Sequence, residues 1–247
     1  MSKDIITVRN LRREFIVGGE KVKALRGVSF TIRQGEFVTI MGTSGSGKST
    51  LLNLLGCLDT PTSGEYELDG VSVQKMSKNQ RAVTRNRKIG FVFQNYNLLP
   101  KTTAVENVEL PLLYNSSVSA KERRERAIKC LEAVGLGSRL YHKSNQMSGG
   151  QQQRVAIARA LVNDPVIILA DEATGNLDSR TSMSILMLFQ ELYERGRTIV
   201  FVTHNPELAL YSSRNIVVRD GKIVEDTLNP SPASARETYE NLPKEID

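Results

Sequence analysis

The residues best suited to chemistry lie in a glycine-rich stretch that begins at position 42. It reads Gly-Thr-Ser-Gly-Ser-Gly-Lys-Ser and matches the pattern G-x-x-x-x-G-K-[ST]. In that pattern the glycines let backbone N–H groups surround phosphate oxygens, the lysine reaches the terminal phosphates and the serine hydroxyl can bind Mg²⁺. Many families share this loop, so it indicates a nucleoside triphosphate but no particular reaction. The predicted nucleotide-binding residues are Gly42, Thr43, Ser44, Gly45, Ser46, Gly47, Lys48, Ser49 and Thr50.

A pair of acids follows a second apolar run. Residues 166–170 read as a buried strand, and Asp171 and Glu172 come directly after them. An aspartate at the carboxyl end of such a strand can hold Mg²⁺, as in P-loop NTPases generally. The neighbouring glutamate can polarise a water for attack on the γ-phosphate. Alone, the pair could equally be a solvated turn, but the upstream phosphate loop favours the catalytic interpretation.

A third candidate is a run of small residues that opens a predicted helix. Ser148, Gly149, Gly150 and Gln151 stand at its start, and the positive end of a helix attracts anions. Alone, this run is as easily a helix cap. Together with the two motifs above it becomes diagnostic of a nucleotide site.

These groups require strands that end side by side. The apolar run 37–41 precedes the phosphate loop, and further strands are expected at 89–93, 166–170 and 199–203. Helices are expected at 49–58 and 180–195, with a short one at 206–211. Such alternation of strands and helices predicts an α/β core with a mostly parallel sheet. Short strands at 5–8, 22–25 and 28–32 come before it, and a hairpin at 216–224 closes it.

The middle of the chain changes to a helical pattern from about 94 to 161. Ser119, with Glu122 three residues later, is a plausible cap for a charged helix over 119–134. We therefore predict one domain over residues 1–228 with a helical subdomain inserted at about 95–160. Residues 229–247 hold three prolines and many charges, and we expect a loosely attached tail.

Composition excludes several classes of function. The 247 residues carry a net charge of +6, but no apolar run approaches the roughly 18–20 residues that span a bilayer. The first residues do not resemble a signal peptide, so any membrane role must come through a partner. The basic clusters at 81–88 and 121–126 lack interleaved aromatics, which argues against nucleic acid. Two cysteines and two histidines make a metal cluster of these residues improbable.

Taken together, the motifs resemble those of the ATP-binding cassette (ABC) ATPases over about residues 4 to 228. The run 147–151 is similar to the signature motif of that family, which usually begins with Leu where this chain has Met147. The resemblance implies a RecA-like P-loop core, an N-terminal antiparallel β subdomain and an inserted α-helical subdomain. It also gives roles to Gln94 in the Q-loop, Asp178 in the D-loop and His204 as the switch histidine. Phe15 would lie against the adenine ring.

The same resemblance implies a mechanism. Two copies would face head to tail, with each ATP between the phosphate loop of one copy and the signature residues of the other. The implied cofactors are ATP and Mg²⁺. The implied catalytic residues are Glu172, His204, Gln94 and Lys48, the metal ligands are Ser49, Gln94 and Asp171, and the signature contacts are Ser148, Gly149, Gly150 and Gln151.

Three stretches, 58–64, 93–100 and 171–178, resemble the MacB/LolD/FtsE branch of the family. That branch implies an integral membrane permease with a large extracytoplasmic domain, docked near residues 94–113, and a peripheral location on the cytoplasmic face of the bacterial inner membrane. Ala173 departs from the proline usual there, which frees one backbone N–H after Glu172.

Several functions remain open at this point. The chain could drive export or extraction of a substrate, or it could be an FtsE-like regulatory ATPase that signals without transport. A soluble DNA-repair or translation ATPase of related type usually needs coiled-coil insertions or tandem cassettes, and neither is visible. A small-molecule P-loop kinase would leave residues 148–151 and His204 unexplained.

Overall fold

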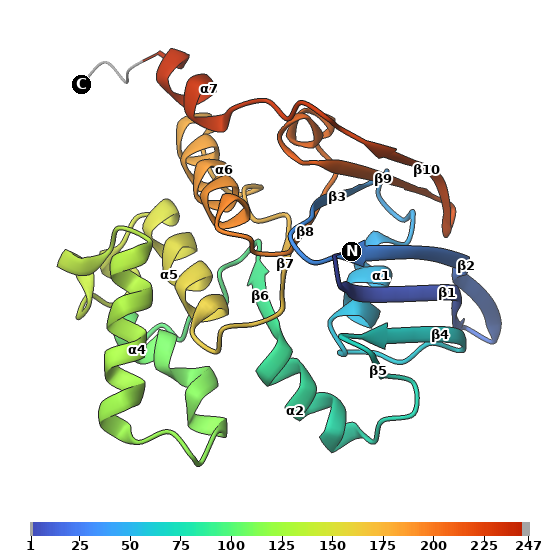
Figure 1. Cartoon of the computed structure of the whole chain (residues 1–247), viewed down its shortest axis with the longest axis horizontal. Helices are drawn as coiled ribbons and strands as arrows, with labels where there is room; N and C mark the ends of the chain where they lie inside the picture. Colours follow the sequence, from blue (N-terminus) through green and yellow to red (C-terminus); the bar gives the residue numbers. More distant parts are fainter. Residues whose placement is uncertain (1, 244–247) are drawn as a thin grey trace.

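A computed structural model describes residues 2–243 and contains two sheets with a helical lobe beside them (Figure 1). The smaller sheet is antiparallel in the order β2-β1-β4-β5. Its strands are β1 (Asp4–Val17), β2 (Glu20–Arg33), β4 (Ser63–Leu68) and β5 (Val71–Ser72). The sequence analysis expects separate strands at 22–25 and 28–32, but the structure joins them. Gly27 lies between them at φ +96°, where the pairing register shifts, so the expected break is a β-bulge within one long strand.

The larger sheet has six strands in the order β10-β9-β3-β8-β7-β6. β3 (Phe37–Met41), β8 (Ile199–Thr203), β7 (Ile167–Asp171) and β6 (Ile89–Phe93) run parallel, and β9 (Arg214–Arg219) is parallel to β3. Only β10 (Lys222–Leu228) is antiparallel to its neighbour among the described residues. The predicted α/β fold with a mostly parallel sheet is confirmed. Because the parallel strands β3, β8, β7 and β6 end at one edge of the sheet, the groups that follow them gather there.

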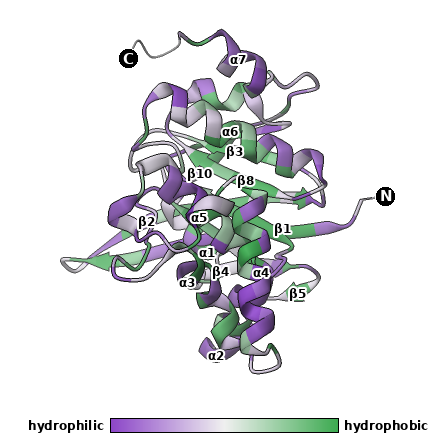
Figure 2. Cartoon of the chain, turned by 90° about the vertical axis from the view of Figure 1, so that its left-hand side faces the viewer, coloured by the Kyte–Doolittle hydropathy of each residue, from purple (hydrophilic) through white to green (hydrophobic). Residues whose placement is uncertain are grey.

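Helices pack on both faces of this sheet. α1 (Lys48–Leu55) contacts β2, β7 and β8, and its leucines belong to the core between the two sheets. α1 ends three residues before the predicted end at 58, because Gly56 and Cys57 leave the helical conformation and a side chain at Gly56 would collide with the Phe91 ring. α6 (Ser179–Glu194) and the 3₁₀ segment η4 (Pro206–Tyr211) belong to the second core. Figure 2 shows hydrophobic residues concentrated in the central strands and hydrophilic ones on outer helices such as α7.

The inserted lobe is built from helices that pack on one another. Its helices are α3 (Ala104–Glu109), α4 (Ala120–Ala133) and α5 (Gly149–Leu161), with 3₁₀ turns η1 (Leu110–Tyr114), η2 (Gly137–Arg139) and η3 (Ser144–Gln146). Ser119 caps α4 by accepting a hydrogen bond from the Glu122 N–H, as the sequence predicts. A further helix, α2 (Lys78–Lys88), leads into β6 and was not anticipated. No described helix is long and apolar enough to cross a bilayer.

The expectation of a loose tail is wrong for the part that the structure describes. α7 (Ala235–Asn241) lies along α6, with Ala235 fully buried. The Gln190 side chain fixes it, because Nε2 donates to the Ala233 carbonyl at 2.8 Å and Oε1 accepts from the Ala235 N–H at 2.8 Å. The sequence analysis missed this contact because the partner lies on a helix more than forty residues upstream. Residues 244–247 of the predicted tail lie outside the described part.

Candidate nucleotide-binding site

The phosphate loop connects β3 to α1 at the carboxyl edge of the large sheet. Glycine is required at two of its positions by close packing. A Cβ at Gly42 would lie 2.2 Å from the Val218 carbonyl oxygen, and one at Gly47 would lie 2.6 Å from the Ala24 carbonyl oxygen. Gly47 also has φ +107°. Backbone atoms therefore pack closely against the loop at the start of α1, where unpaired helix N–H groups attract phosphate.

The side chains of the loop fit a phosphate group. Ser46 Oγ is buried and has no hydrogen-bond partner within residues 2–243, so it is a free donor. Lys48 is 7% exposed, and its amine donates to the carbonyls of Gly42 at 2.8 Å and Thr43 at 2.9 Å. Burial lowers the pKa of Lys48, while the charges of Glu172 and Asp171 act to raise it. A cation held here beside unpaired donors favours an anionic ligand.

The acidic pair lies next to this lysine. Burial raises the pKa of Asp171, the neighbouring Glu172 raises it further, and Lys48 lowers it. Asp171 ends β7, and Ser49 is an exposed residue in the first turn of α1. A hydroxyl and a carboxylate are the hard oxygen ligands that Mg²⁺ prefers, so both residues fit the predicted metal site.

Glu172 faces the predicted switch histidine. His204 Nδ1 lies 2.8 Å from Glu172 Oε1, and both residues line a cavity of about 320 Å³. Glu172 has a positive φ of 46°, an unusual value for a residue other than glycine, and such values are often found at functional sites. Its backbone N–H donates to the Val202 carbonyl, which fixes the turn after β7 to β8. The structure therefore brings the catalytic candidates of two adjacent strands into contact.

Gln94 follows β6, the strand next to β7 in the sheet. It contacts the D-loop through Asn176, for which the sequence predicted no individual role. Its Nε2 donates to Asn176 Oδ1 at 3.2 Å, and Asn176 Nδ2 donates to the Asn95 side chain at 2.9 Å. Asp178 itself caps α6 by accepting from the Thr181 N–H at 2.7 Å, and hydrogen bonding to the side chain and then the backbone of Thr181 lowers the pKa of Asp178. The Q-loop and the D-loop thus form one hydrogen-bonded unit.

The signature residues 148–151 lie next to Tyr96 of the Q-loop, Leu177 of the D-loop and Thr181 of α6. Ser148 and Gln151 form a reciprocal capping box at the start of α5. A Cβ at Gly149 would meet the Tyr96 hydroxyl at 2.8 Å, and one at Gly150 would meet the Thr181 side chain at 2.4 Å. The helix start therefore packs on the Q-loop and on α6. In contrast, the Lys48 amine bonds to its own loop and has Glu172 and Asp171 as its acidic neighbours.

Phe15 occupies a half-buried position near the end of β1. The Arg13 guanidinium lies over its ring at 4.5 Å from the centroid, and Arg13 also pairs with Asp59. An aromatic ring held in this way presents a face on which a base can stack. Contact of Phe15 with adenine stays a prediction.

Two residues that the sequence analysis missed connect the lobe to the catalytic groups. Gln153 is fully buried, and its Nε2 donates at 2.7 Å to the carbonyl of Ala173, next to Glu172. Arg159 donates to the carbonyls of Tyr96 and Asn97 in the Q-loop. Gln153 stands three and four residues before the buried Ala156 and Ile157, so helical spacing could have placed it on the inner face.

Comparison with known proteins agrees with this geometry. The sequence profile described as "ABC transporter" matches residues 25–175, more than half of the chain. An uncharacterized ABC transporter ATP-binding protein of Thermotoga maritima is 57% identical over 221 residues, covering 90% of this chain and 94% of the relative. The macrolide export ATP-binding/permease protein MacB of Syntrophobacter fumaroxidans is 54% identical over 222 residues, but these cover 89% of this chain and only 31% of that protein.

A solved structure is similar throughout the fold. The dimeric ATP-binding cassette MJ0796 of Methanocaldococcus jannaschii, in a post-hydrolysis state bound to ADP and Pi, has a TM-score of 0.82 at 47% identity. The match covers 90% of this chain and 98% of that one. A phosphate loop, an acidic pair and a histidine at one sheet edge, together with these matches, show that the chain belongs to the ABC transporter family as an ATP-binding subunit.

Proposed function

We propose that this chain is the ATP-hydrolysing subunit of a bacterial ABC transporter of MacB/LolD type, driving export or extraction of a substrate through a separate membrane subunit. The observation that carries the hydrolytic part is the 2.8 Å contact between Glu172 and His204, beside the Lys48 loop. A carboxylate held at the edge of the sheet by a neighbouring strand is placed to accept a proton from an attacking water.

The remaining residues bind and orient ATP in this proposal. Lys48 and the backbone of the loop hold the phosphates, Phe15 stacks on adenine, and His204 contacts the γ-phosphate. Ser49, Asp171 and Gln94 would hold Mg²⁺, which when bound neutralises charge on the phosphates. Glu172→Gln keeps the shape of the side chain but removes the proton acceptor. We expect it to lower the rate of hydrolysis on the order of 10²- to 10⁴-fold, with ATP binding retained.

A second copy of the chain completes each site. The signature helix faces the D-loop side while Lys48 bonds within its own loop, so a copy related by a two-fold axis would bring residues 148–151 to the other phosphate loop. The dimeric state of the archaeal cassette supports this arrangement.

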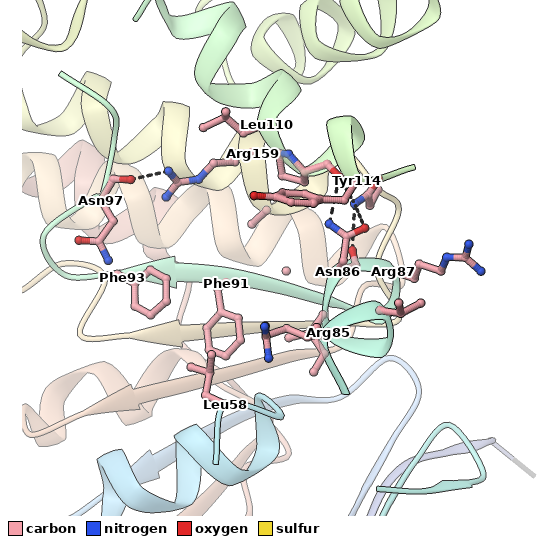
Figure 3. Close-up of a pocket in the computed structure, with 17 residues that line it drawn as sticks. Leu58, Arg85, Asn86, Arg87, Phe91, Phe93, Asn97, Leu110, Tyr114 and Arg159 are labelled. Atoms are coloured by element: carbon pink, nitrogen blue, oxygen red, sulfur yellow. Dashed lines mark hydrogen bonds between the residues drawn. The ribbon is translucent and has the colours of Figure 1, made fainter. Parts of the chain in front are cut away.

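A groove beside the helical lobe is suited to a membrane subunit. It has a volume of about 700 Å³ and lies between α2, β6, η1 and α5 (Figure 3). Three large apolar side chains on its walls are exposed: Leu58 at 48%, Val83 at 51% and Tyr114 at 83%. The expected docking region, 94–113, contributes only Asn97, Leu110 and Pro111, so the proposed surface is wider than the sequence predicts. The MacB relative, which has ATP-binding and permease parts in one chain, supports a permease as the occupant.

Purification of tagged Glu172→Gln chain with ATP from native membranes tests the transport assignment. We expect a partner with few membrane helices and a large extracytoplasmic domain. The topology of that partner would then place the ATPase on the cytoplasmic face of the membrane. Its transport activity would separate an exporter from a regulatory complex. Recovery of a permease with many helices would overturn the branch, and recovery of no membrane protein would overturn the transport function.

Substitution in the groove tests the docking surface. Tyr114→Asp places a charge in the groove, and we expect it to abolish stimulation of ATP hydrolysis by the membrane subunit while basal hydrolysis stays within about twofold. Tyr141→Asp is the matched control, because Tyr141 is also exposed, at 68%, but does not line the groove. Equal stimulation of the two variants would exclude this groove as the contact.

A further inference from the structure

The turn that carries Glu172 is held by hydrogen bonds from neighbouring elements. The Glu172 N–H donates to the Val202 carbonyl of β8, and the carbonyl of the next residue, Ala173, accepts from Gln153 Nε2 of α5 at 2.7 Å. Glu172 has φ 46°, a conformation that persists in residues other than glycine only where the surroundings impose it. The Gln153 bond therefore helps to impose the backbone conformation of Glu172.

A second side chain reaches the same turn but holds it less firmly. Ser182 Oγ lies 3.2 Å from the Thr174 carbonyl and 3.3 Å from the Leu177 carbonyl. A hydroxyl has one proton, so it donates fully to only one of these carbonyls at a time. The Gln153 bond is shorter, has a single acceptor and lies one residue closer to Glu172. Gln153 is therefore the main side-chain restraint on the backbone of the turn.

Packing of the core does not explain a glutamine at position 153. Gln153 is fully buried, and Ala156 and Ile157, on the same side of α5, are buried too. Its Oε1 is buried without a hydrogen-bond partner within residues 2–243, so the amide bonds only to Ala173 in this part of the chain. Because a buried acceptor without a partner destabilises the fold, an apolar side chain of similar size would suit the core equally well. The amide therefore serves the Ala173 carbonyl rather than the core.

α5 is a firm support for this bond. Near the end of the helix, Arg159 donates to the carbonyls of Asn97 at 2.6 Å and Tyr96 at 2.7 Å. At its start, a Cβ added to Gly149 would lie 2.8 Å from the Tyr96 hydroxyl, so the helix packs closely there as well. Gln153 lies between these two contacts. The bond to Ala173 therefore connects the turn to a helix that is itself held at both ends.

We propose that Gln153 is a positioning residue for ATP hydrolysis, which holds the Glu172 turn through the Ala173 carbonyl. Without this bond the backbone of Glu172 is free to leave its left-handed conformation, and the carboxylate then moves away from His204. ATP binding does not depend on the bond, because the phosphate loop follows a different strand, β3. This inference rests on the proposed function, in which Glu172 accepts a proton from the attacking water.

Gln153→Met tests the positioning role, because it keeps the length of the side chain and removes the donor. A misplaced catalytic group lowers kcat, so we expect kcat to fall at least about tenfold while KM for ATP stays within about twofold. The substitution removes one unpaired acceptor, Oε1, and leaves another, the Ala173 carbonyl. We therefore expect the melting temperature to stay within about 4 °C of wild type.

Gln190→Met is the matched control. It makes the same substitution at an amide that bonds to Tyr211, Ala233 and Ala235, outside the Glu172 turn. We expect it to lower the melting temperature and to leave kcat within about twofold of wild type. An equal fall in kcat in both variants would overturn the positioning role, and so would a wild-type kcat in Gln153→Met. If neither Gln153→Met nor Gln153→Leu folds, Gln153 is structural and the proposal is wrong.

A spectroscopic measurement follows the position of Glu172 without nucleotide. The chain has two histidines: His204 lies 2.8 Å from Glu172, whereas His142 lies beside Arg139 in the lobe. Their imidazole rings give two sets of ¹⁵N resonances, which a His142→Gln variant assigns. We expect Gln153→Met to shift the His204 resonances and leave those of His142 in place, and Gln190→Met to shift neither. Unchanged His204 resonances in Gln153→Met would overturn the proposal.

The two measurements separate this inference from the proposed function. A wild-type chain that does not hydrolyse ATP would overturn the proposed function, and the imidazole spectra would still show whether Gln153 holds Glu172. Hydrolysis by wild type and by Gln153→Met at equal rates would overturn the positioning role alone.

Discussion

At the residue scale, the candidate site combines adjacent acids with different environments. Asp171 ends a buried strand, where desolvation and the charge of Glu172 raise its pKa, and Lys48 opposes both effects. Glu172, one residue later, turns out of the strand with a positive φ and contacts His204. The two carboxylates can therefore take separate tasks, metal binding and proton acceptance, although they are neighbours in sequence.

The raised pKa of Asp171 predicts how stability depends on pH. The folded-state pKa of Asp171 lies above the unfolded value, so the ionised carboxylate destabilises the fold. The free energy of unfolding therefore falls as the pH rises from the unfolded pKa through the folded pKa. Asp171→Asn removes this cost. Lys48 still has Glu172 as an acidic neighbour, and the charge of Glu172 raises the pKa of Lys48 more than that of Asp171 does. We expect the nucleotide-free variant to melt about 1–4 °C above wild type at pH 7, with a smaller difference as the pH falls toward the ordinary carboxyl pKa of 3.8.

Thermal melts of both proteins across this pH range provide the measurement. A lower melting temperature for the variant at pH 7 would show that ionised Asp171 is stabilised in the fold, against the desolvation argument. Hydrolysis by the variant should nevertheless be lost, because the proposed metal ligand is gone. Such a gain in stability with a loss of activity is common at functional sites.

At the scale of elements, side-chain amides connect parts that are distant in sequence. Gln153 joins α5 to the carbonyl after Glu172, and Asn176 joins the Q-loop to the D-loop. Gln190 does the same for α6 and the segment before α7, where it bonds to one backbone donor, Ala235, and to the backbone carbonyls of Tyr211 and Ala233. These bonds place the lobe, the D-loop and the C-terminal helix in fixed relation to the sheet.

Removal of the Gln190 amide should release α7. Gln190→Ala removes the hydrogen-bond partner of the Ala233 carbonyl, the Tyr211 carbonyl and the Ala235 N–H, which costs about 1–3 kcal/mol. Urea unfolding measures the cost, and Glu194→Ala on the exposed face of the same helix is the control. If the two variants unfold alike, α7 contributes little to the stability of the domain.

At the scale of the whole molecule, the proposed dimer builds each nucleotide site from the phosphate loop of one copy and the signature residues of the other. This separation predicts complementation between defective copies. Lys48→Ala disables the phosphate loop, while Ser148→Asp keeps a helix cap but opposes phosphate with a negative charge. Each variant alone should be inactive, but a mixed dimer has one intact pair of halves.

Mixing the two variants with ATP in equal amounts tests this. Half of the random dimers are mixed and each has one working site of two, so roughly a quarter of wild-type hydrolysis should return. The unmixed variants at the same total concentration are the controls. Activity that does not rise on mixing would mean that each chain completes its own site.

The sequence by itself determined the parts that local chemistry specifies. Alternating apolar runs fixed the parallel core, and the glycine spacing fixed the phosphate loop, because both depend on residues close together in the chain. The acidic pair and the histidine could be placed at strand ends for the same reason. Ser119 as the cap of α4 followed from its spacing to Glu122.

Only the tertiary structure decided which distant residues meet. The Glu172–His204 contact, the Asn176 bridge, the Gln153 bond to Ala173 and the packing of α7 on α6 all join segments far apart in sequence. The bulge at Gly27 likewise depends on strand pairing rather than composition. Residue spacing encodes local geometry, whereas these contacts arise from burial and hydrogen-bond satisfaction once the layers have packed.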